Sequence, residues 1–184
     1  LWSRVVDDGP IQAMADTVRV DGITVFLTVV ILSSVILTSL LADGYLRRER
    51  LEGPEAYVLL LLSAAGGIVM AGANDLLVLF LGLEILSIAA YVLAGLHVRR
   101  ARSGEAALKY FLYGATASAV MLYGMSLLYG ATGTTDLAQL ATALGARAQG
   151  ELVWLVTPAV VMLLVGFGFK ASLVPFHQWA PDTY

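Results

Sequence analysis

The sequence DLLVLFLGLEILSIAAYVLAGL, residues 75–96, is an apolar stretch of about the length that crosses a bilayer as one helix. This stretch decides the fold class, because a soluble protein rarely contains so long a predominantly apolar run. Glu84 lies near its middle. At the centre of a membrane helix an acidic side chain costs roughly 2.5 to 3.5 kcal/mol on insertion scales, so it usually faces the bundle interior with a partner. We therefore expect Glu84 to be a functional residue.

The composition of the whole chain agrees with this interpretation. Hydrophobic residues make up 59% of the 184 residues, charged residues make up 14%, and the mean hydropathy is +0.81, which indicates an integral membrane protein. The net charge of −3 argues against nucleic acid as a partner. The sequence contains no cysteine, which excludes Cys-ligated clusters, and its two histidines, His97 and His177, are too few and too far apart to suggest a haem or zinc site. We expect no cofactor or metal on this chain, so that any electron chemistry lies elsewhere.

The hydropathy pattern predicts an all-α fold, a polytopic bundle of about five transmembrane helices in a single membrane domain, residues 1–184. The predicted helices span residues 23–42, 54–71, 74–96, 104–130 and 151–171. A short amphipathic helix at 134–146, after Asp136 as a first-turn acid or cap, is expected on the external surface. The sequence has no initial methionine and ends without a terminal element, as expected for a fragment of a longer polypeptide.

The loop charges predict the orientation in the membrane. Arginines cluster after the first and third predicted helices, and by the positive-inside rule these loops face the cytoplasm. They are Arg47, Arg48, Arg50, Arg99, Arg100 and Arg102. The opposite side has fewer arginines (Arg4, Arg19, Arg147) and an N-terminal stretch with Asp7, Asp8, Asp16 and Asp21. The N-terminal end is thus predicted to be external and the C-terminal end cytoplasmic.

Lys109 is the first of two lysines inside apolar helices. It lies about five residues from the cytoplasmic end of its helix, and from that depth a lysine can extend to the headgroups. The alternative is functional, because Lys109, Tyr113 and Thr116 follow the i, i+4, i+7 spacing of one helix face. Such a polar stripe can hold water inside a bundle.

Lys170 lies in GFGFKASLVPFHQWAPD, residues 166–182, where the glycines and Pro175 predict a discontinuous last helix. A break exposes backbone carbonyls, which must then line a cavity or meet side chains. In such a place a nearby carboxylate raises the pKa of a lysine, and its departure lowers that pKa again. The alternative is a helix that ends near Lys170 at the cytoplasmic interface. His177 is a candidate proton relay or, equally, an interfacial residue, whereas His97 suits the basic belt of its loop.

If both helices are straight, Glu84 and Lys170 lie at different depths in the membrane. Glu84 is roughly 15 Å from the external end of its helix and Lys170 roughly 24 Å, at about 1.5 Å per residue. A break or tilt could bring them together. If the last helix is straight, Lys109 and Lys170 are the level pair instead.

Three strings carry a family resemblance. They are NDLLVLFLGLEILSIAAYVLAG (74–95), EAALKYFLYGATASAVMLYGMSLLYGATGTTDL (105–137) and GFGFKASLVPFHQWAPDTY (166–184). Together they closely resemble subunit N of bacterial NADH:quinone oxidoreductase, respiratory complex I. The other antiporter-like subunits of that complex, and subunits of multi-subunit cation/proton antiporters, are more distant relatives. The resemblance extends over nearly the whole chain.

The resemblance implies roles for four residues. The family's fifth-helix glutamate and the lysine of its broken seventh helix form a pair, which corresponds to Glu84 and Lys170 here. The sixth-helix lysine corresponds to Lys109. These residues would transfer protons, with His177 as a candidate relay. The five predicted helices would be the third to seventh of the family, so this chain would hold only the first half-channel.

The implied function is proton translocation by a membrane-arm subunit of a translocase, with a Glu/Lys pair whose proton affinity is switched. NADH, flavin, iron–sulfur clusters and quinone would act on other subunits, and the partners would be other membrane-arm subunits, the lipid bilayer and the transported protons. The expected location is the bacterial inner membrane. Two alternatives stay open, namely a subunit of a cation/proton antiporter and a passive scaffold whose charges only pack helices.

Overall fold

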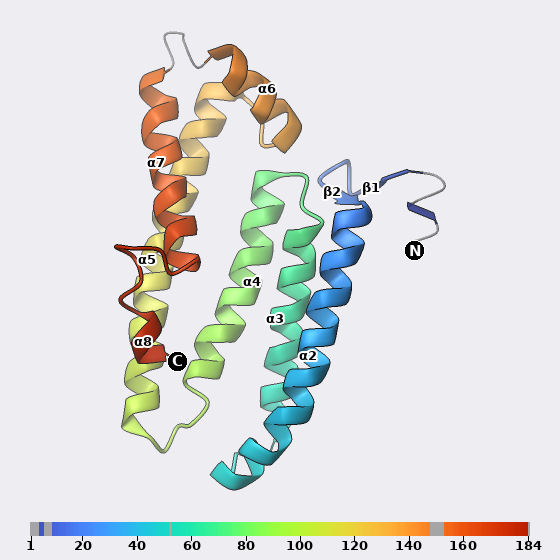
Figure 1. The fold of residues 1–184 in the computed structure, drawn as a ribbon. Helices are drawn as coiled ribbons and strands as arrows, with labels where there is room; N and C mark the ends of the chain where they lie inside the picture. Colours follow the sequence, from blue (N-terminus) through green and yellow to red (C-terminus); the bar gives the residue numbers. More distant parts are fainter. Residues whose placement is uncertain (1–3, 6–8, 52, 148–152, 184) are drawn as a thin grey trace. The chain divides into compact units, whose positions relative to one another are not determined.

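The computed structural model describes residues 4–5, 9–51, 53–147 and 153–183. Within these residues two short strands precede a series of helices (Figure 1). They are β1 (Ile11–Ala13), β2 (Val18–Val20), α2 (Gly22–Glu49), α3 (Glu55–Ala71), α4 (Leu76–Ala94), α5 (Ala101–Thr132), α6 (Leu137–Arg147), α7 (Val153–Lys170) and α8 (Ala180–Thr183). The predicted helical bundle is confirmed. Asp7, Asp8 and the expected start of the last long helix, Glu151, lie outside the described residues.

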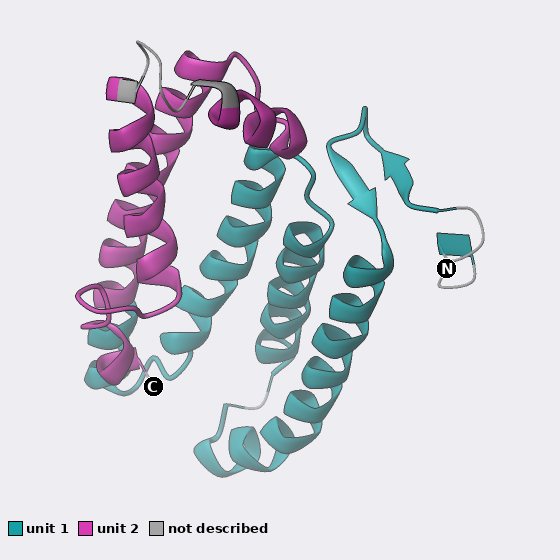
Figure 2. Cartoon of the chain, turned by 45° about the horizontal axis from the view of Figure 1, so that its top comes forward, with its two compact units in different colours: residues 1–107 teal, residues 108–184 magenta. Residues whose placement is uncertain are grey.

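The chain divides into two compact units, Leu1–Ala107 and Leu108–Tyr184, shown in different colours in Figure 2. Helix α5 begins in the first unit and continues into the second. Each unit is described here by itself. The expectation of a single membrane domain stays a prediction.

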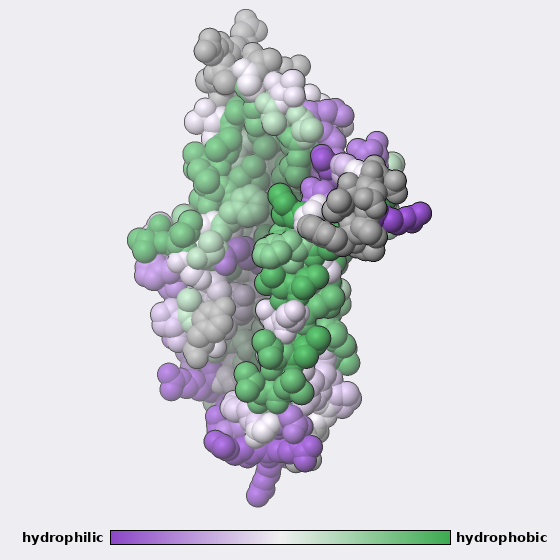
Figure 3. Space-filling model, turned by 45° about the vertical axis from the view of Figure 1, so that its right-hand side comes forward, coloured by the Kyte–Doolittle hydropathy of each residue, from purple (hydrophilic) through white to green (hydrophobic). Residues whose placement is uncertain are grey.

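Within the described part of the chain, three helices are long and apolar enough to cross a membrane, namely α2, α4 and α5. Helix α3 and the part of α7 from Trp154 to Lys170 are shorter apolar helices, at the lower end of the spanning range. Many large apolar side chains are exposed, among them Phe26 and Leu41 on α2. Figure 3 shows hydrophobic residues, in green, gathered over broad areas of one face. Lipid or partner helices would cover such a surface in a membrane protein.

Helices α3 and α4 form an antiparallel hairpin (Figure 1), as the short sequence between them predicts. Asp75 caps α4, because its Oδ1 accepts hydrogen bonds from the N–H groups of Leu77 and Val78 at 2.8 and 3.3 Å. Gly66 and Gly82 let the two backbones approach each other closely. A Cβ atom at Gly82 would lie 2.6 Å from the backbone nitrogen of Met70. The two helices therefore pack closely through these glycines.

The β1–β2 hairpin was not expected from the sequence. It pairs Ile11 with Val20 in antiparallel register and packs on the α3–α4 turn. The N–H of Arg19 donates to the Gly72 carbonyl at 2.8 Å, and the N–H of Asn74 donates to the Thr17 carbonyl at 2.9 Å. The hairpin thus satisfies backbone groups of a turn that lies between two apolar helices.

In the second unit α5 packs against α7, again through glycines. A Cβ atom at Gly124 would lie 2.9 Å from the Ala159 carbonyl oxygen, and one at Gly166 would lie 2.5 Å from the Met121 Cβ. Between these helices α6 is capped by Asp136, whose Oδ1 accepts from the Gln139 N–H at 2.7 Å. The expected short helix and its acidic cap are confirmed, and its position on an external surface stays a prediction.

Helical backbone ends at Lys170 and returns only in α8. The N–H of Leu173 donates to the Gly168 carbonyl at 2.8 Å, and the N–H of Ser172 donates to the Phe169 carbonyl at 3.0 Å. These bonds satisfy carbonyls at the end of α7, as a helix terminus requires. The discontinuity predicted from the glycines and proline around Lys170 agrees with this geometry.

Asp21 caps α2 and gives a testable pH dependence. Hydrogen bonding from the Thr24 N–H, at 2.9 Å, holds the pKa of the Asp21 carboxyl below its ordinary value of 3.8. Because the folded-state pKa is lowered, the stabilisation is present above the ordinary value and is lost as the pH falls through the folded-state value. We expect Asp21→Ala to cost about 1 kcal/mol at neutral pH. Thermal unfolding of the chain in detergent measures this loss.

Asp21→Asn is the matched control for that prediction. Asparagine caps a helix about as well as aspartate but does not titrate in acid. The Asn variant should therefore have the stability of the wild type at neutral pH. As the pH falls, it should lose less stability than the wild type, because it lacks the Asp21 carboxyl. A wild-type and an Asn chain with the same acid dependence would contradict the assignment.

Candidate intramembrane proton-transfer residues

Glu84 lies in the middle third of α4, eight positions after Leu76 and ten before Ala94. Its side chain is half-buried, between the fully packed Leu83 and the buried Ser87. At about 1.5 Å per residue the carboxylate is about 12 Å from one helix end and about 15 Å from the other. The residue thus lies in the apolar middle of a membrane-length helix, where a carboxylate is costly and usually marks a functional site.

Lys109 forms an ion pair that the sequence did not predict. Its Nζ lies 3.2 Å from Oδ2 of Asp182 in α8, and both side chains are about half exposed within this chain. The contact joins residues 73 positions apart. Asp182 follows Pro181 in the apolar C-terminal stretch, and an acid in that setting was the signal that could have identified it.

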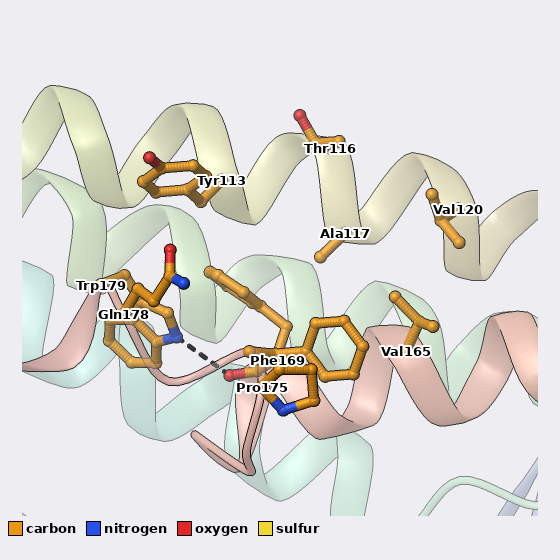
Figure 4. Close-up of a pocket in the computed structure, with 10 residues that line it drawn as sticks. Tyr113, Thr116, Ala117, Val120, Val165, Phe169, Pro175, Gln178 and Trp179 are labelled. Carbon is orange, nitrogen blue, oxygen red and sulfur yellow. Dashed lines mark hydrogen bonds between the residues drawn. The ribbon is translucent and has the colours of Figure 1, made fainter.

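Trp179 fixes the segment that carries Asp182. Its indole stacks on the Tyr110 ring with centroids 4.3 Å apart and planes 3° from parallel. Its Nε1–H donates to the Phe169 carbonyl at 3.1 Å, the dashed line in Figure 4. Only 4% of Trp179 is exposed. Because Tyr110 is the neighbour of Lys109 and Trp179 is three residues from Asp182, the stack and the ion pair hold the same two segments together.

A cavity of about 260 Å³ adjoins the stack. Its wall comes from α5, α7 and the segment between α7 and α8, as Figure 4 shows, and is mainly apolar. The lining residues are Tyr113, Thr116, Ala117, Val120, Val165, Phe169, Pro175, Phe176, Gln178 and Trp179. Tyr113 and Thr116 belong to the polar stripe expected on this helix, and both line the cavity. Thr116, however, donates its hydroxyl to the Leu112 carbonyl at 2.8 Å.

Lys170 is the last residue of α7 and is half-buried. Its position in the last turn suits a cation, because the carbonyl end of a helix carries partial negative charge. Its Nζ lies 6.0 Å from the centroid of the Phe169 ring, at the outer limit of a cation–π contact. His177 is exposed and lies in the segment between α7 and α8.

The structure brings Lys109 together with Asp182, a residue outside the predicted set. Glu84 belongs to the first unit, whereas Lys109, Lys170 and His177 belong to the second. The Glu84–Lys170 pair and the proton-transfer roles of all four residues stay predictions.

Comparison with known proteins gives consistent relatives. Residues 73–184 match the family described as NADH:quinone oxidoreductase/Mrp antiporter, TM. NADH-quinone oxidoreductase subunit N 1 of Sorangium cellulosum is 48% identical over 177 residues, which is 94% of this chain and 34% of that protein. Subunit N of Gemmatimonas aurantiaca is 45% identical, over 96% of this chain and 34% of its own.

A solved structure is similar as well. A chain of respiratory complex I from Thermus thermophilus with bound aureothin superposes with a TM-score of 0.75 at 39% identity. The match covers 95% of this chain and 36% of the Thermus chain. This chain thus spans about a third of the length of the relatives that it matches.

Apolar helices of membrane length, with ionisable side chains within them, define a multi-pass helical membrane protein. The family match extends over more than half of the residues and includes Glu84, Lys109 and Lys170. The chain belongs to the NADH:quinone oxidoreductase/Mrp antiporter family. The resemblance to subunit N that the sequence strings indicate is confirmed by these relatives.

Proposed function

We propose that this chain is part of the proton-translocating, antiporter-like subunit N of an NADH:quinone oxidoreductase. One observation carries the proposal, namely a glutamate in the middle of α4 in a chain that belongs to this family. A carboxylate at that depth is costly and is retained in membrane proteins mainly along ion pathways.

The proposed partners and location are supported by the same relatives, and the proposed orientation rests on the arginines of the loops. The protein would lie in the bacterial inner membrane beside other membrane-arm subunits, with its N-terminal end external and its C-terminal end cytoplasmic. Flavin, iron–sulfur clusters and the sites for NADH and quinone would be on other subunits. This chain would contribute proton transfer and no redox chemistry.

The proposed mechanism uses charge separation within the membrane. Two unit charges about 4 Å apart interact by about 4 kcal/mol at an effective dielectric of 20, enough to change a proton equilibrium by about three orders of magnitude. Approach of Glu84 to Lys170 would hold a proton on the lysine, and separation would release it toward Lys109 and His177. Asp182 gives Lys109 a counter-charge of its own, at 3.2 Å.

Reconstitution tests the proposal directly. Vesicles that contain the complete oxidoreductase with this subunit should acidify on one side when NADH reduces quinone. Vesicles with an oxidoreductase that lacks the subunit should acidify less for each NADH oxidised. The pH gradient is followed with a fluorescent dye, and NADH oxidation is followed in the same sample. Acidification that is unchanged without the subunit would contradict the proposal.

The family description favours a second candidate, because it includes the Mrp antiporters. In that case the subunit would exchange Na⁺ or K⁺ for protons without NADH. Transport that requires Na⁺ or K⁺ and proceeds without NADH would select the antiporter. A passive scaffold would instead show loss of assembly with no separate defect in pumping.

A further inference from the structure

Three polar side chains meet at the end of α4 opposite its Asp75 cap. Glu49, the last residue of α2, accepts a hydrogen bond from Nη2 of Arg100, with 2.6 Å between Nη2 and Oε2. The Nε2 of His97 lies 3.4 Å from the same carboxylate oxygen. The carboxylate, imidazole and guanidinium therefore form one cluster, and all three residues belong to the first unit.

The imidazole of His97 is largely buried, and one of its nitrogens lacks a partner. The His97 side chain is 15% exposed and that of Glu49 is 20% exposed. Among the described residues, Nδ1 of His97 is the buried side-chain nitrogen or oxygen for which no hydrogen-bond partner is found. Buried polar atoms in proteins are almost always hydrogen-bonded, and an unmade bond costs about 1 to 3 kcal/mol. Water is the partner that a polar site of this kind ordinarily recruits.

The local backbone holds His97 in place. The hydroxyl of Ser103 donates to the Ala94 carbonyl at 2.7 Å, and the N–H of Arg100 donates to the His97 carbonyl at 2.9 Å. The charged groups against His97 are Glu49 from α2 and Arg100 from the loop before α5. The charges of Glu49 and Arg100 cancel, so a proton added to the imidazole makes the cluster positive by one unit.

We propose that Glu49, His97 and Arg100 form a proton-exchange site at this end of the bundle. In the neutral imidazole Nε2 carries the hydrogen, 3.4 Å from the Glu49 carboxylate oxygen, and Nδ1 is an enclosed nitrogen with a lone pair and no partner in the described part of the chain. When water enters the site, Nδ1 takes a proton that this water relays from hydronium in the bulk, which gives an imidazolium and leaves neutral water, and the proton returns by the same way or passes to the next acceptor. Imidazole exchanges protons between about pH 5 and 8, which suits this task.

The site deepens the proposed function, on which it rests, because it names a place where protons can enter. The loop charges predict that this end faces the cytoplasm. About 15 Å of α4 separates Glu84 from the helix end at Ala94, beside the cluster. An exchange group there would supply protons to the helix that carries the buried carboxylate.

His97→Gln tests the site in vesicles that contain the complete oxidoreductase. Glutamine keeps a polar side chain but does not titrate, so protons pumped per NADH oxidised should fall several-fold, with NADH oxidation retained. Added imidazole should restore part of the pumping, because a small diffusible base can replace the missing exchange group. Arg47→Gln is the matched control, because it removes a charge at the same end of α2 from an exposed pair with Asp43 and should change neither measurement.

Normal pumping by His97→Gln would overturn the inference. Reduced pumping that added imidazole does not restore would also overturn it and would leave the cluster as a structural link between α2 and the α4–α5 loop. A wild-type complex that oxidises NADH without pumping protons would instead contradict the proposed function.

A second measurement does not depend on pumping. In the subunit with nitrogen-labelled histidine the NMR ring signals that disappear in His97→Gln identify His97, and their shifts should show a hydrogen on Nε2 and none on Nδ1. Glu49→Gln should change the Nε2 shift, because it removes the negative charge 3.4 Å from that atom. A hydrogen on Nδ1, or ring signals that Glu49→Gln leaves unchanged, would overturn the inference.

Discussion

Glu84→Gln is expected to reduce proton pumping by about a hundredfold or more while the complex still assembles. A positioned proton-transfer side chain typically contributes at least about 10²-fold to a rate, and glutamine has nearly the shape of glutamate but cannot carry the proton. Because Glu84 is half-buried in α4 beside the tight α3–α4 contact, a substitution of equal size leaves the packing intact. Proton uptake per NADH oxidised in vesicles measures the effect.

The control for this experiment is Glu55→Gln. Glu55 is an exposed carboxylate in the first turn of α3, so its loss changes the net charge by the same amount without changing the middle of α4. Pumping by this variant should equal that of the wild type. If Glu84→Gln pumped normally in an assembled complex, the proton-transfer role of Glu84 would be wrong.

Gly82→Ala is expected to destabilise the α3–α4 hairpin strongly. The new Cβ would lie 2.6 Å from the Met70 nitrogen and 2.8 Å from the Gly66 carbonyl oxygen. Both are backbone atoms, so the overlap can be relieved only if the helices separate. Overpacking of this kind costs about 1 to 3 kcal/mol, and more where the backbone must move. Thermal unfolding in detergent and the amount of subunit in membranes both report the loss.

Gly44→Ala is the matched control on a helix of the same unit. A Cβ at Gly44 meets no atom within 4 Å, and alanine stabilises a helix interior by up to about 1 kcal/mol relative to glycine. The Gly44 variant should be as stable as the wild type or more stable. Equal stability of the Gly82 and Gly44 variants would contradict the close contact.

The sequence predicted the helices well, because the length of an apolar run is enough to identify a membrane helix. The stretch around Glu84 was expected at residues 74–96 and forms α4 at Leu76–Ala94. The Asp136 cap and the break in helical backbone after Lys170 were also expected, because each has a local cause in capping or in glycine and proline.

The partners of polar residues could not be predicted in this way. Asp182 meets Lys109 across 73 residues, and Glu49 meets Arg100 across 51. No local rule relates such positions, because the pairing depends on which helix faces pack together. His97 was expected to belong to the basic belt, and its buried ring shows a more specific environment.

The sequence by itself determined that this chain is a bundle of apolar helices with Glu84 inside one of them, because the cost of exposing apolar surface or burying charge follows from residue type and spacing alone. Tertiary structure decided which charged side chains have partners and which backbone groups of the α3–α4 turn form hydrogen bonds with the β1–β2 hairpin. It also decided that Nδ1 of His97 is buried without a hydrogen-bond partner among the residues that the structure describes. These features arise from contacts between segments far apart in the chain, and folding alone brings such segments within hydrogen-bond distance.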